Sequence, residues 1–232
     1  MAQFFTAYPY IPAAEPDSIL KVFRHYGRER VFKKNEVLKP AHESGLLFLV
    51  EQGVCAYVQL AQTQSVIPFL LLPGRTLGDI SLLAGSHYKM EWRALSDGSL
   101  LVVPPTVLTH VVLSDHQLTL EKIKHIISKE EAALEAKDAN MTLPSEMRLR
   151  LLIMGLLLAT DTYHGEWMVL PHRLNAETLG MVVSLNRTNV TRQISEWRQK
   201  GLAQREGADL LVHKSLFRGL EDWRKNPGDS DV

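Results

Sequence analysis

Short apolar stretches, broken about every ten residues by turn residues, occupy the chain from residue 28 to residue 113. This spacing is typical of small antiparallel sheets that are closed or packed on each other. Gln52-Gly53 and Pro73-Gly74 fall between stretches, where glycine can take the positive φ of a tight turn. The pattern predicts a β-roll or β-barrel with strands over residues 31–32, 45–51, 54–59, 66–72, 76–77, 92–94 and 100–103.

The pattern changes between residues 114 and 139, where glycine and proline are absent and apolar residues return at intervals of seven. This predicts one helix, roughly 35 Å long at about 1.5 Å per residue. Its apolar stripe contains Leu120, Ile123, Ile127 and Leu134. The stripe lies either against the helix's own roll or against the same helix of a second chain. We expect the dimer, because a long solitary helix between two domains has too little intrachain surface to bury such a stripe.

Two short helices are predicted in the last third of the chain. Asn175 can cap a helix over residues 176–183, and after a three-residue turn Asn186 can cap a second helix. Apolar side chains recur on the second helix at i, i+4 and i+7, namely Val190, Ile194 and Trp197. Its opposite face carries guanidinium and hydroxyl groups suited to base edges and phosphates, namely Arg187, Thr188, Thr191, Arg192 and Ser195. This arrangement is typical of a helix-turn-helix.

The segment behind these helices has the length and polarity of a β-hairpin, with strands over residues 202–204 and 210–213 and a charged turn over residues 205–207. Such a hairpin matches the wing of a winged helix. Between residues 170 and 218 there are eight lysines and arginines against four acids, although the whole chain carries 26 of each kind. The positive charge is therefore local to the predicted helix pair, which favours binding to nucleic acid there.

Four segments carry a resemblance to a known family. Residues 45–58 contain a strand, a glycine turn and a strand, residues 73–80 contain the next turn, and residues 176–180 and 186–194 contain the two short helices. Together they resemble the bacterial family of the cyclic-AMP receptor protein and the fumarate and nitrate reduction regulator. The resemblance covers nearly the whole chain. It implies a dimeric transcription factor with an amino-terminal sensor roll, a long dimer helix and a carboxyl-terminal winged helix.

The resemblance also implies which residues contact DNA. Asn186, Arg187, Thr188 and Arg192 fall where family members contact phosphates and bases. Thr188 replaces a glutamate that often reads cytosine, so the operator sequence does not carry over. Ser184 replaces the common glycine of the turn, which is strained if its backbone is left-handed.

The effector pocket that the resemblance implies departs from the family pattern. Members that bind a cyclic nucleotide use a Gly-Glu pair for the ribose and an Arg-Ser or Arg-Thr pair for the phosphate. Here these pairs are Gly78-Asp79 and Lys89-Met90. Asp79 is one methylene shorter, Lys89 offers a point charge in place of a planar fork, and Met90 has no hydroxyl. We therefore expect no response to cyclic AMP, and a roll that is either a scaffold or tuned to another effector.

The chain is predicted to be α+β with three parts: a sensor-like β-roll over residues 1–113, a dimerisation helix and hinge over 114–141, and a winged helix-turn-helix over 142–232. Residues 140–143 form the hinge, and Pro144 begins a helix that runs through residue 159. We expect a homodimeric, sequence-specific transcription regulator that binds double-stranded DNA. The alternative is a roll that binds an effector and works through protein contacts without DNA. The loop over residues 161–167 is a candidate contact for RNA polymerase or an ordinary solvated loop.

Metal and cofactor chemistry finds little support in the sequence. Cys55 is the only cysteine, which excludes a four-cysteine zinc site and a cysteine-ligated iron–sulfur cluster within one chain. Its position in a predicted strand indicates a packed core thiol, with redox sensing as the alternative. The nine histidines form no pair at metal-binding spacing, although haem ligation by His42, His87 or His116 stays open.

Enzyme and membrane functions find no support either. The chain lacks a glycine-rich phosphate loop and a nucleophile elbow, so we predict no catalytic residue and no cofactor. No apolar run approaches the ~20 residues that a spanning helix needs, and the amino terminus lacks the pattern of an export signal. We therefore expect a cytoplasmic protein without a membrane partner.

Overall fold

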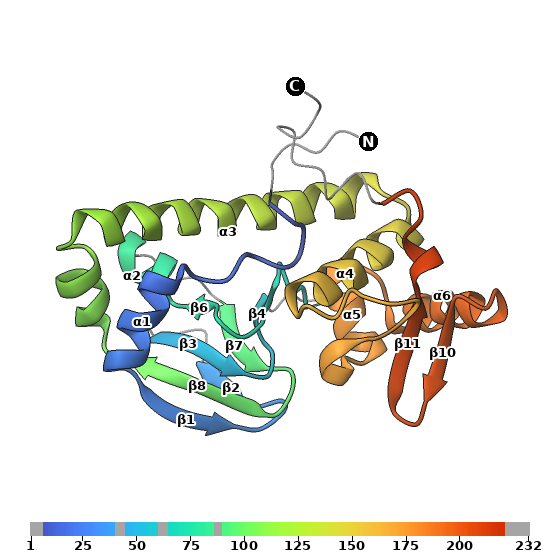
Figure 1. Ribbon diagram of the computed structural model, residues 1–232, viewed down its shortest axis with the longest axis horizontal. Coiled ribbons are helices and arrows are strands. Elements are labelled where there is room, and N and C mark those ends of the chain that lie inside the picture. The colour runs from blue at the N-terminus through green and yellow to red at the C-terminus, as the bar shows by residue number, and fades with distance from the viewer. Residues whose placement is uncertain (1–6, 40–44, 60–64, 86–89, 221–232) are drawn as a thin grey trace. The chain divides into compact units, whose positions relative to one another are not determined.

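The computed structural model describes residues 7–39, 45–59, 65–85 and 90–220 (Figure 1). Within these ranges the chain divides into two compact units. One unit covers Pro12–Glu130, and the other joins residues 7–11 to residues 131–220. Helix α3 (His116–Thr142) contributes residues to both. The first unit contains the predicted roll, and the second contains the predicted pair of short helices.

The roll has two antiparallel sheets, each of four strands among the described residues, in the orders β1-β8-β3-β6 and β2-β7-β4-β5. The strands are β1 (Arg28–Phe32), β2 (Val37–Lys39), β3 (Leu47–Gln52), β4 (Cys55–Gln59), β5 (Leu70–Leu71), β6 (Thr76–Leu77), β7 (Met90–Ala94) and β8 (Gly98–Val103). The predicted fold class is confirmed. The strand predicted over 66–72 is wrong in extent, because only β5 and an isolated bridge at Val66 pair there. Pro68 lies between them and cannot donate to a ladder.

The core of the roll lies between the two sheets. The first four residues of β3 and the first four of β4 are all buried, which explains why these parts of the strands are continuous apolar runs without alternation. The rings of Phe48 and Tyr57 pack edge to face on Trp92, with ring centroids 5.3 and 5.8 Å away. This geometry suits the aromatic quadrupoles, and the three large side chains link the two sheets.

Two helices of the roll were not predicted. Helix α1 (Asp17–Tyr26) buries Ile19, Leu20 and Phe23 in a cluster with β3, β8 and the π-helical segment Val107–Val112. Helix α2 (Asp79–Ala84) directly follows β6 and is only six residues long. Helix α2 is too short to show a clear periodicity in the sequence. Helix α1 does carry the signal, since its buried Ile19, Leu20 and Phe23 recur at helical spacing.

Helix α3 confirms the predicted long helix, but the predicted hinge over residues 140–143 is too early. The helix continues to Thr142, and only Leu143 separates it from the capping residue Pro144 and α4 (Ser145–Ala159). Asn140 stays helical because its side chain has partners outside the helix. The Tyr10 hydroxyl donates to its Oδ1 (2.9 Å), and its Nδ2 donates to the carbonyl of Val182 (3.1 Å).

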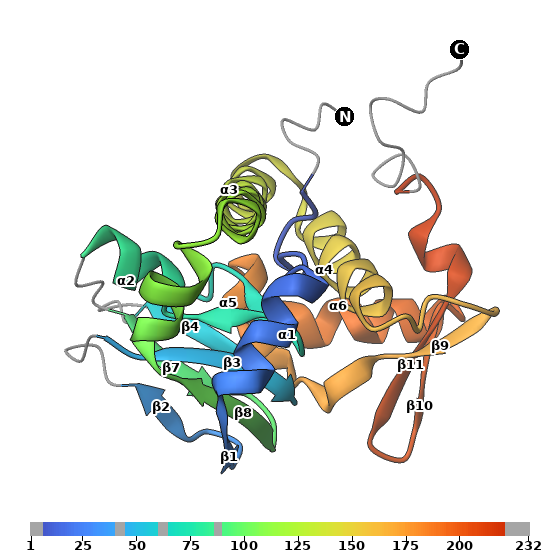
Figure 2. The same cartoon turned by 60° about the vertical axis from the view of Figure 1, so that its left-hand side comes forward.

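The second unit contains α4, α5 (Ala176–Val183), α6 (Arg187–Gln199) and, among its described residues, a three-stranded antiparallel sheet in the order β10-β11-β9 (Figure 2). The strands are β9 (Trp167–Val169), β10 (Ala203–Glu206) and β11 (Asp209–His213). The predicted hairpin is confirmed, but its turn is Gly207-Ala208 and not residues 205–207, because Arg205 and Glu206 still pair with β11. Strand β9 was not predicted, and the loop before it ends at Glu166.

Candidate nucleic-acid interface and effector turn

Helix α5 is fixed at both ends by local chemistry. At its start, Asn175 Oδ1 accepts a hydrogen bond from the backbone N–H of Thr178 (2.8 Å), which confirms the predicted cap. At its end, Ser184 is left-handed with φ 53°, so this serine carries the strain that the missing glycine would avoid. A Cβ on Gly180 would come within 2.4 Å of the Leu185 carbonyl oxygen. Glycine there lets the turn between α5 and α6 pack closely.

Helix α6 has one buried side, as the sequence predicts. Asn186 Oδ1 accepts from the backbone N–H of Asn189 (2.8 Å) and caps the helix. Val190, Ile194 and Trp197 are buried. The Trp197 indole donates its N–H to Glu146 Oε1 on α4 (3.1 Å), so this large buried side chain has no unpaired donor. These contacts set the rotation of α6 about its axis.

The opposite side of α6 faces solvent. Every residue that the sequence analysis assigned to DNA is exposed, namely Asn186, Arg187, Thr188, Thr191, Arg192 and Ser195. The Thr191 hydroxyl donates to the Arg187 carbonyl within the helix (2.9 Å), which leaves its oxygen able to accept. Arg192 Nε lies 3.9 Å from Glu196 Oε1, a weak exposed pair that leaves the guanidinium available to a ligand.

A cavity of about 570 Å³ lies beside this face, between α6, the start of α5 and the β10–β11 hairpin. The described residues that line it include four arginines and a single acid, Glu177; the arginines are Arg173, Arg187, Arg198 and Arg205. Of these four, only Arg187 is predicted from the sequence to contact DNA. The local excess of positive charge was the signal for the other three, but only the fold brings them to one cavity.

Arg173 has an unusual backbone and a fixed side chain. Its φ is 46° and that of His172 is 66°, so two successive residues are left-handed. Its Nε donates to Asp209 Oδ1 (2.7 Å) and its Nη2 to Oδ2 (3.3 Å) of the same carboxylate. This forked pair ties the segment before α5 to the start of β11.

The apolar stripe of α3 is exposed. Leu120, Ile123, Ile127 and Leu134 have between 44% and 52% of their surface accessible. The alternative that this stripe packs on the helix's own roll is therefore wrong. The buried face of the first part of α3 is charged instead, with Lys122, His125 and Lys129 turned into the roll.

The turn at Gly78–Asp79, called the effector turn here because the resemblance places the effector pocket there, is buried like the charged face of α3. Gly78 has φ 99° and precedes Asp79, whose side chain is completely buried. Lys129 Nζ donates to Asp79 Oδ1 (3.1 Å) and Oδ2 (2.8 Å), and Lys122 Nζ lies 2.8 Å from Oδ2. Met90 begins β7 and is half-buried, and Lys89 lies outside the described residues. Asp79 was predicted from the sequence as a pocket residue, whereas the two lysines were not.

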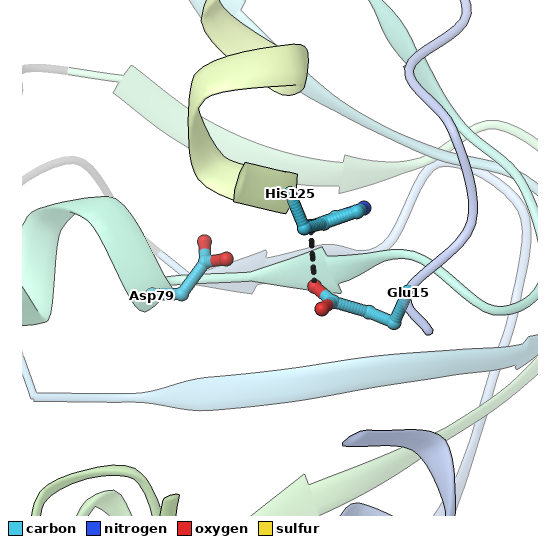
Figure 3. Close-up of side chains that lie close together, drawn as sticks. All are labelled: Glu15, Asp79 and His125. Carbon is cyan, nitrogen blue, oxygen red and sulfur yellow. Dashed lines mark ion pairs between the residues drawn. The ribbon is translucent and has the colours of Figure 1, made fainter. Parts of the chain in front are cut away.

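Glu15 completes the cluster around this turn (Figure 3). Its Oε1 lies 2.5 Å from Lys122 Nζ and 3.1 Å from His125 Nδ1. Burial alone would raise the pKa of Glu15, but Lys122, the His125 hydrogen bond and Lys129 together lower it to about 2. Burial opposes ionisation of Asp79 too, yet Lys122 and Lys129 hold its pKa well below the usual range. Both carboxylates are therefore charged at neutral pH.

Glu15, Asp79 and His125 place three possible metal-ligand atoms within 4.8 Å of one another. Both carboxylates are already paired with ammonium groups, however, so a cation would have to displace Lys122 and Lys129. Cys55 offers no alternative chemistry. It is completely buried in β4, and burial raises the pKa of its thiol to about 12, which supports the packed-thiol interpretation.

No helix within the described residues is long and apolar enough to cross a membrane.

Known proteins resemble this chain in sequence over the roll and in structure over most of its length. Residues 29–115 match the family model of the cyclic nucleotide-binding domain. A search of curated proteins finds no match.

Solved structures cover most of the chain. FixK2 from Bradyrhizobium japonicum is 20% identical with a TM-score of 0.68, over 83% of this chain and 94% of that one. A CooA mutant from Carboxydothermus hydrogenoformans is 18% identical with a TM-score of 0.67, over 91% and 92%. A CRP-family transcriptional regulator from Thermus thermophilus is 15% identical with a TM-score of 0.67, over 82% and 95%. The chain thus has the fold of CRP/FNR transcription regulators, with a domain of the cyclic nucleotide-binding type.

Proposed function

We propose that the protein is a homodimeric, sequence-specific DNA-binding transcription regulator that works without cyclic AMP. The observation that carries the proposal is the division of α6 into two sides. Its apolar side is buried on α4 and α5, so its guanidinium and hydroxyl side faces solvent beside an arginine-lined cavity. Such a helix can enter a major groove, and arginines beside it can contact the flanking phosphates.

The dimer is proposed from the exposed stripe of α3. Half-exposed leucines and isoleucines at heptad spacing are costly in water and pair well with a second copy of the same helix. A twofold dimer would present two α6 helices about 34 to 36 Å apart, which fits two half-sites one turn of DNA apart. In this proposal residues 1–113 form the sensor-like roll, residues 114–141 hold the dimer together, and residues 142–232 bind DNA.

Independence of cyclic AMP is proposed from the effector turn. Asp79 is buried and paired with lysines. Met90 offers no hydroxyl where cyclic-nucleotide-binding members of the family have a serine or threonine for the phosphate. The rival function, a roll that acts through protein contacts alone, leaves the exposed polar side of α6 unexplained. As a regulator the protein would act in the cytoplasm, and residues 161–167 remain a proposed contact for RNA polymerase.

Arg187→Ala tests the interface, with Arg28→Ala, an exposed arginine of β1, as the control. Gel shifts with genomic fragments first select a bound sequence. If Arg187 reads a base, its loss weakens binding by ~1 to 3 kcal/mol and relaxes preference at one operator position. If Arg187 contacts only phosphate, its loss weakens binding to all sequences alike. The plot of log affinity against log salt concentration then becomes less steep by about one unit. Binding equal to wild type at every salt concentration would show that α6 is not the recognition helix.

A further inference from the structure

The Asp79 carboxylate has no hydrogen-bonding capacity left for a ligand. An ionised carboxylate offers about four lone-pair positions. Among the described residues, Asp79 Oδ1 already accepts from the Ile80 backbone N–H (3.0 Å) and Lys129, while Oδ2 accepts from Lys129 and lies 2.8 Å from Lys122 Nζ. The Thr76 hydroxyl also lies 2.9 Å from Oδ2, but its single proton is shared with Glu15 Oε1. A sugar hydroxyl that needs this carboxylate as an acceptor would therefore have to displace one of these donors.

The competing donors belong to α3. Lys122 and Lys129 are seven residues apart, so they lie on one face of the helix about two turns from each other. Both are completely buried. Lys129 also donates to the Thr76 carbonyl (3.1 Å), and Lys122 binds Glu15 in the segment before α1. The two ammonium groups therefore join α3 to β6, to the start of α2 and to that segment.

The cluster is balanced in charge. Two ammonium groups face two carboxylates, and the pairing of Lys122 with Asp79 and Glu15 raises its pKa in spite of burial. A buried ammonium is tolerated only when it is paired in this way. A cyclic nucleotide would take Asp79 from the lysines and leave a buried cation without its partner. The residues around this turn do not fit a cyclic nucleotide.

We propose that Lys122 and Lys129 are a built-in replacement for an effector at this turn. They neutralise Asp79 and Glu15, keep the turn closed to ligands, and hold the first part of α3 on the roll without any small molecule. The inference deepens the proposed function, since it gives a physical reason why a regulator of this fold needs no cyclic nucleotide. It does not depend on DNA binding.

Titration calorimetry of the full wild-type chain with cyclic AMP and with cyclic GMP tests the closure. We expect no saturable heat up to millimolar nucleotide. Saturable binding by wild type that is lost in Asp79→Asn would overturn the proposal, because Asp79 would then be a ligand group. The expected result, no saturable heat, is measured on the wild type alone. It therefore does not depend on whether the cluster variants fold.

Amide hydrogen exchange tests whether the lysines hold the helix. Lys129→Met leaves one carboxylate unneutralised, so exchange in residues 118–130 should accelerate at least tenfold, while exposed Lys124→Met leaves it unchanged. The double variant Asp79→Asn/Lys129→Met restores charge balance and should recover much of the protection. Wild-type protection in Lys129→Met, or a double variant that loses as much as both single variants together, would refute the pairing. Because neither measurement contains DNA, failure here would overturn the independence of cyclic AMP and leave the proposed DNA binding untouched.

Discussion

Helices α6 and α3 follow opposite rules of burial. Helix α6 hides Val190, Ile194 and Trp197 and exposes its polar side, as an amphipathic helix in water should. Helix α3 hides Lys122 and Lys129 and exposes the apolar stripe of Leu120, Ile123, Ile127 and Leu134. The difference teaches that periodicity identifies the two faces of a helix but not their partners. The apolar face of α6 has its partner within the chain, whereas that of α3 is left for a second chain.

Trp197→Ala should have the largest effect, because it tests whether the buried side of α6 holds the second unit together. Removing a completely buried indole should lower the free energy of unfolding by about 3 to 5 kcal/mol, as both packing and the hydrogen bond to Glu146 are lost. Denaturant unfolding followed by far-UV circular dichroism measures it. The neighbouring exposed Arg198→Ala should change stability by at most about 0.5 kcal/mol. Equal effects of the two variants would contradict the burial pattern of α6.

Ile127→Glu tests the exposed side of α3. Two carboxylates facing each other in a dimer seam should raise the dimer dissociation constant by about 100-fold, roughly 3 kcal/mol. Analytical ultracentrifugation measures the mass. Lys124→Gln makes the same change in net charge outside the stripe and should remain dimeric. A wild-type that is monomeric at micromolar concentration, or an unchanged dimer in Ile127→Glu, would show that this stripe is not the seam.

The buried charges of α3 predict a loss of stability in acid. The pKa of Glu15 falls from 4.5 to about 2 on folding, so its contribution is present above pH 4.5 and is lost as the pH falls toward 2. Asp79 changes in the same direction under the influence of Lys122 and Lys129. Protonation of Glu15 alone should lower the free energy of unfolding of the wild type by about 2 kcal/mol between neutral pH and pH 3. Guanidinium unfolding at several pH values should show a shallower acid slope in Glu15→Gln, and parallel slopes would contradict the pairing.

The sequence predicted the winged part best, because its signals are local. The capping by Asn175 and Asn186 and the stripe of α6 depend on residues a few positions apart, and α5 occupies the predicted residues. The strand predicted over 66–72 is interrupted because Pro68 lies within the apolar run and cannot donate to a ladder. The α3 hinge was misplaced because the partners that keep Asn140 helical, Tyr10 and Val182, are remote in sequence.

The lysine cluster could not be predicted from local pattern. Lys122 and Lys129 look like ordinary solvated residues of an amphipathic helix, and 107 residues separate Lys122 from Glu15. Their partners become visible only when the roll closes. The arginines of the cavity were hidden for the same reason, since Arg173 and Arg205 come from segments on either side of α5 and α6. The charge surplus could only indicate that such a site exists.

We propose that α6 of each chain lies in a major groove of DNA. Cys55 is buried and is the only cysteine, so Thr188→Cys introduces the one exposed thiol among the described residues, to which an iron-chelate cleavage reagent can be attached. Incubated with the selected operator in the absence of cyclic AMP, the labelled protein should cut DNA in two segments about one helical turn apart. The control is the Lys124→Cys protein carrying the same reagent on α3. Cleavage at a single segment, or cleavage no stronger than that of this control, would contradict the claim.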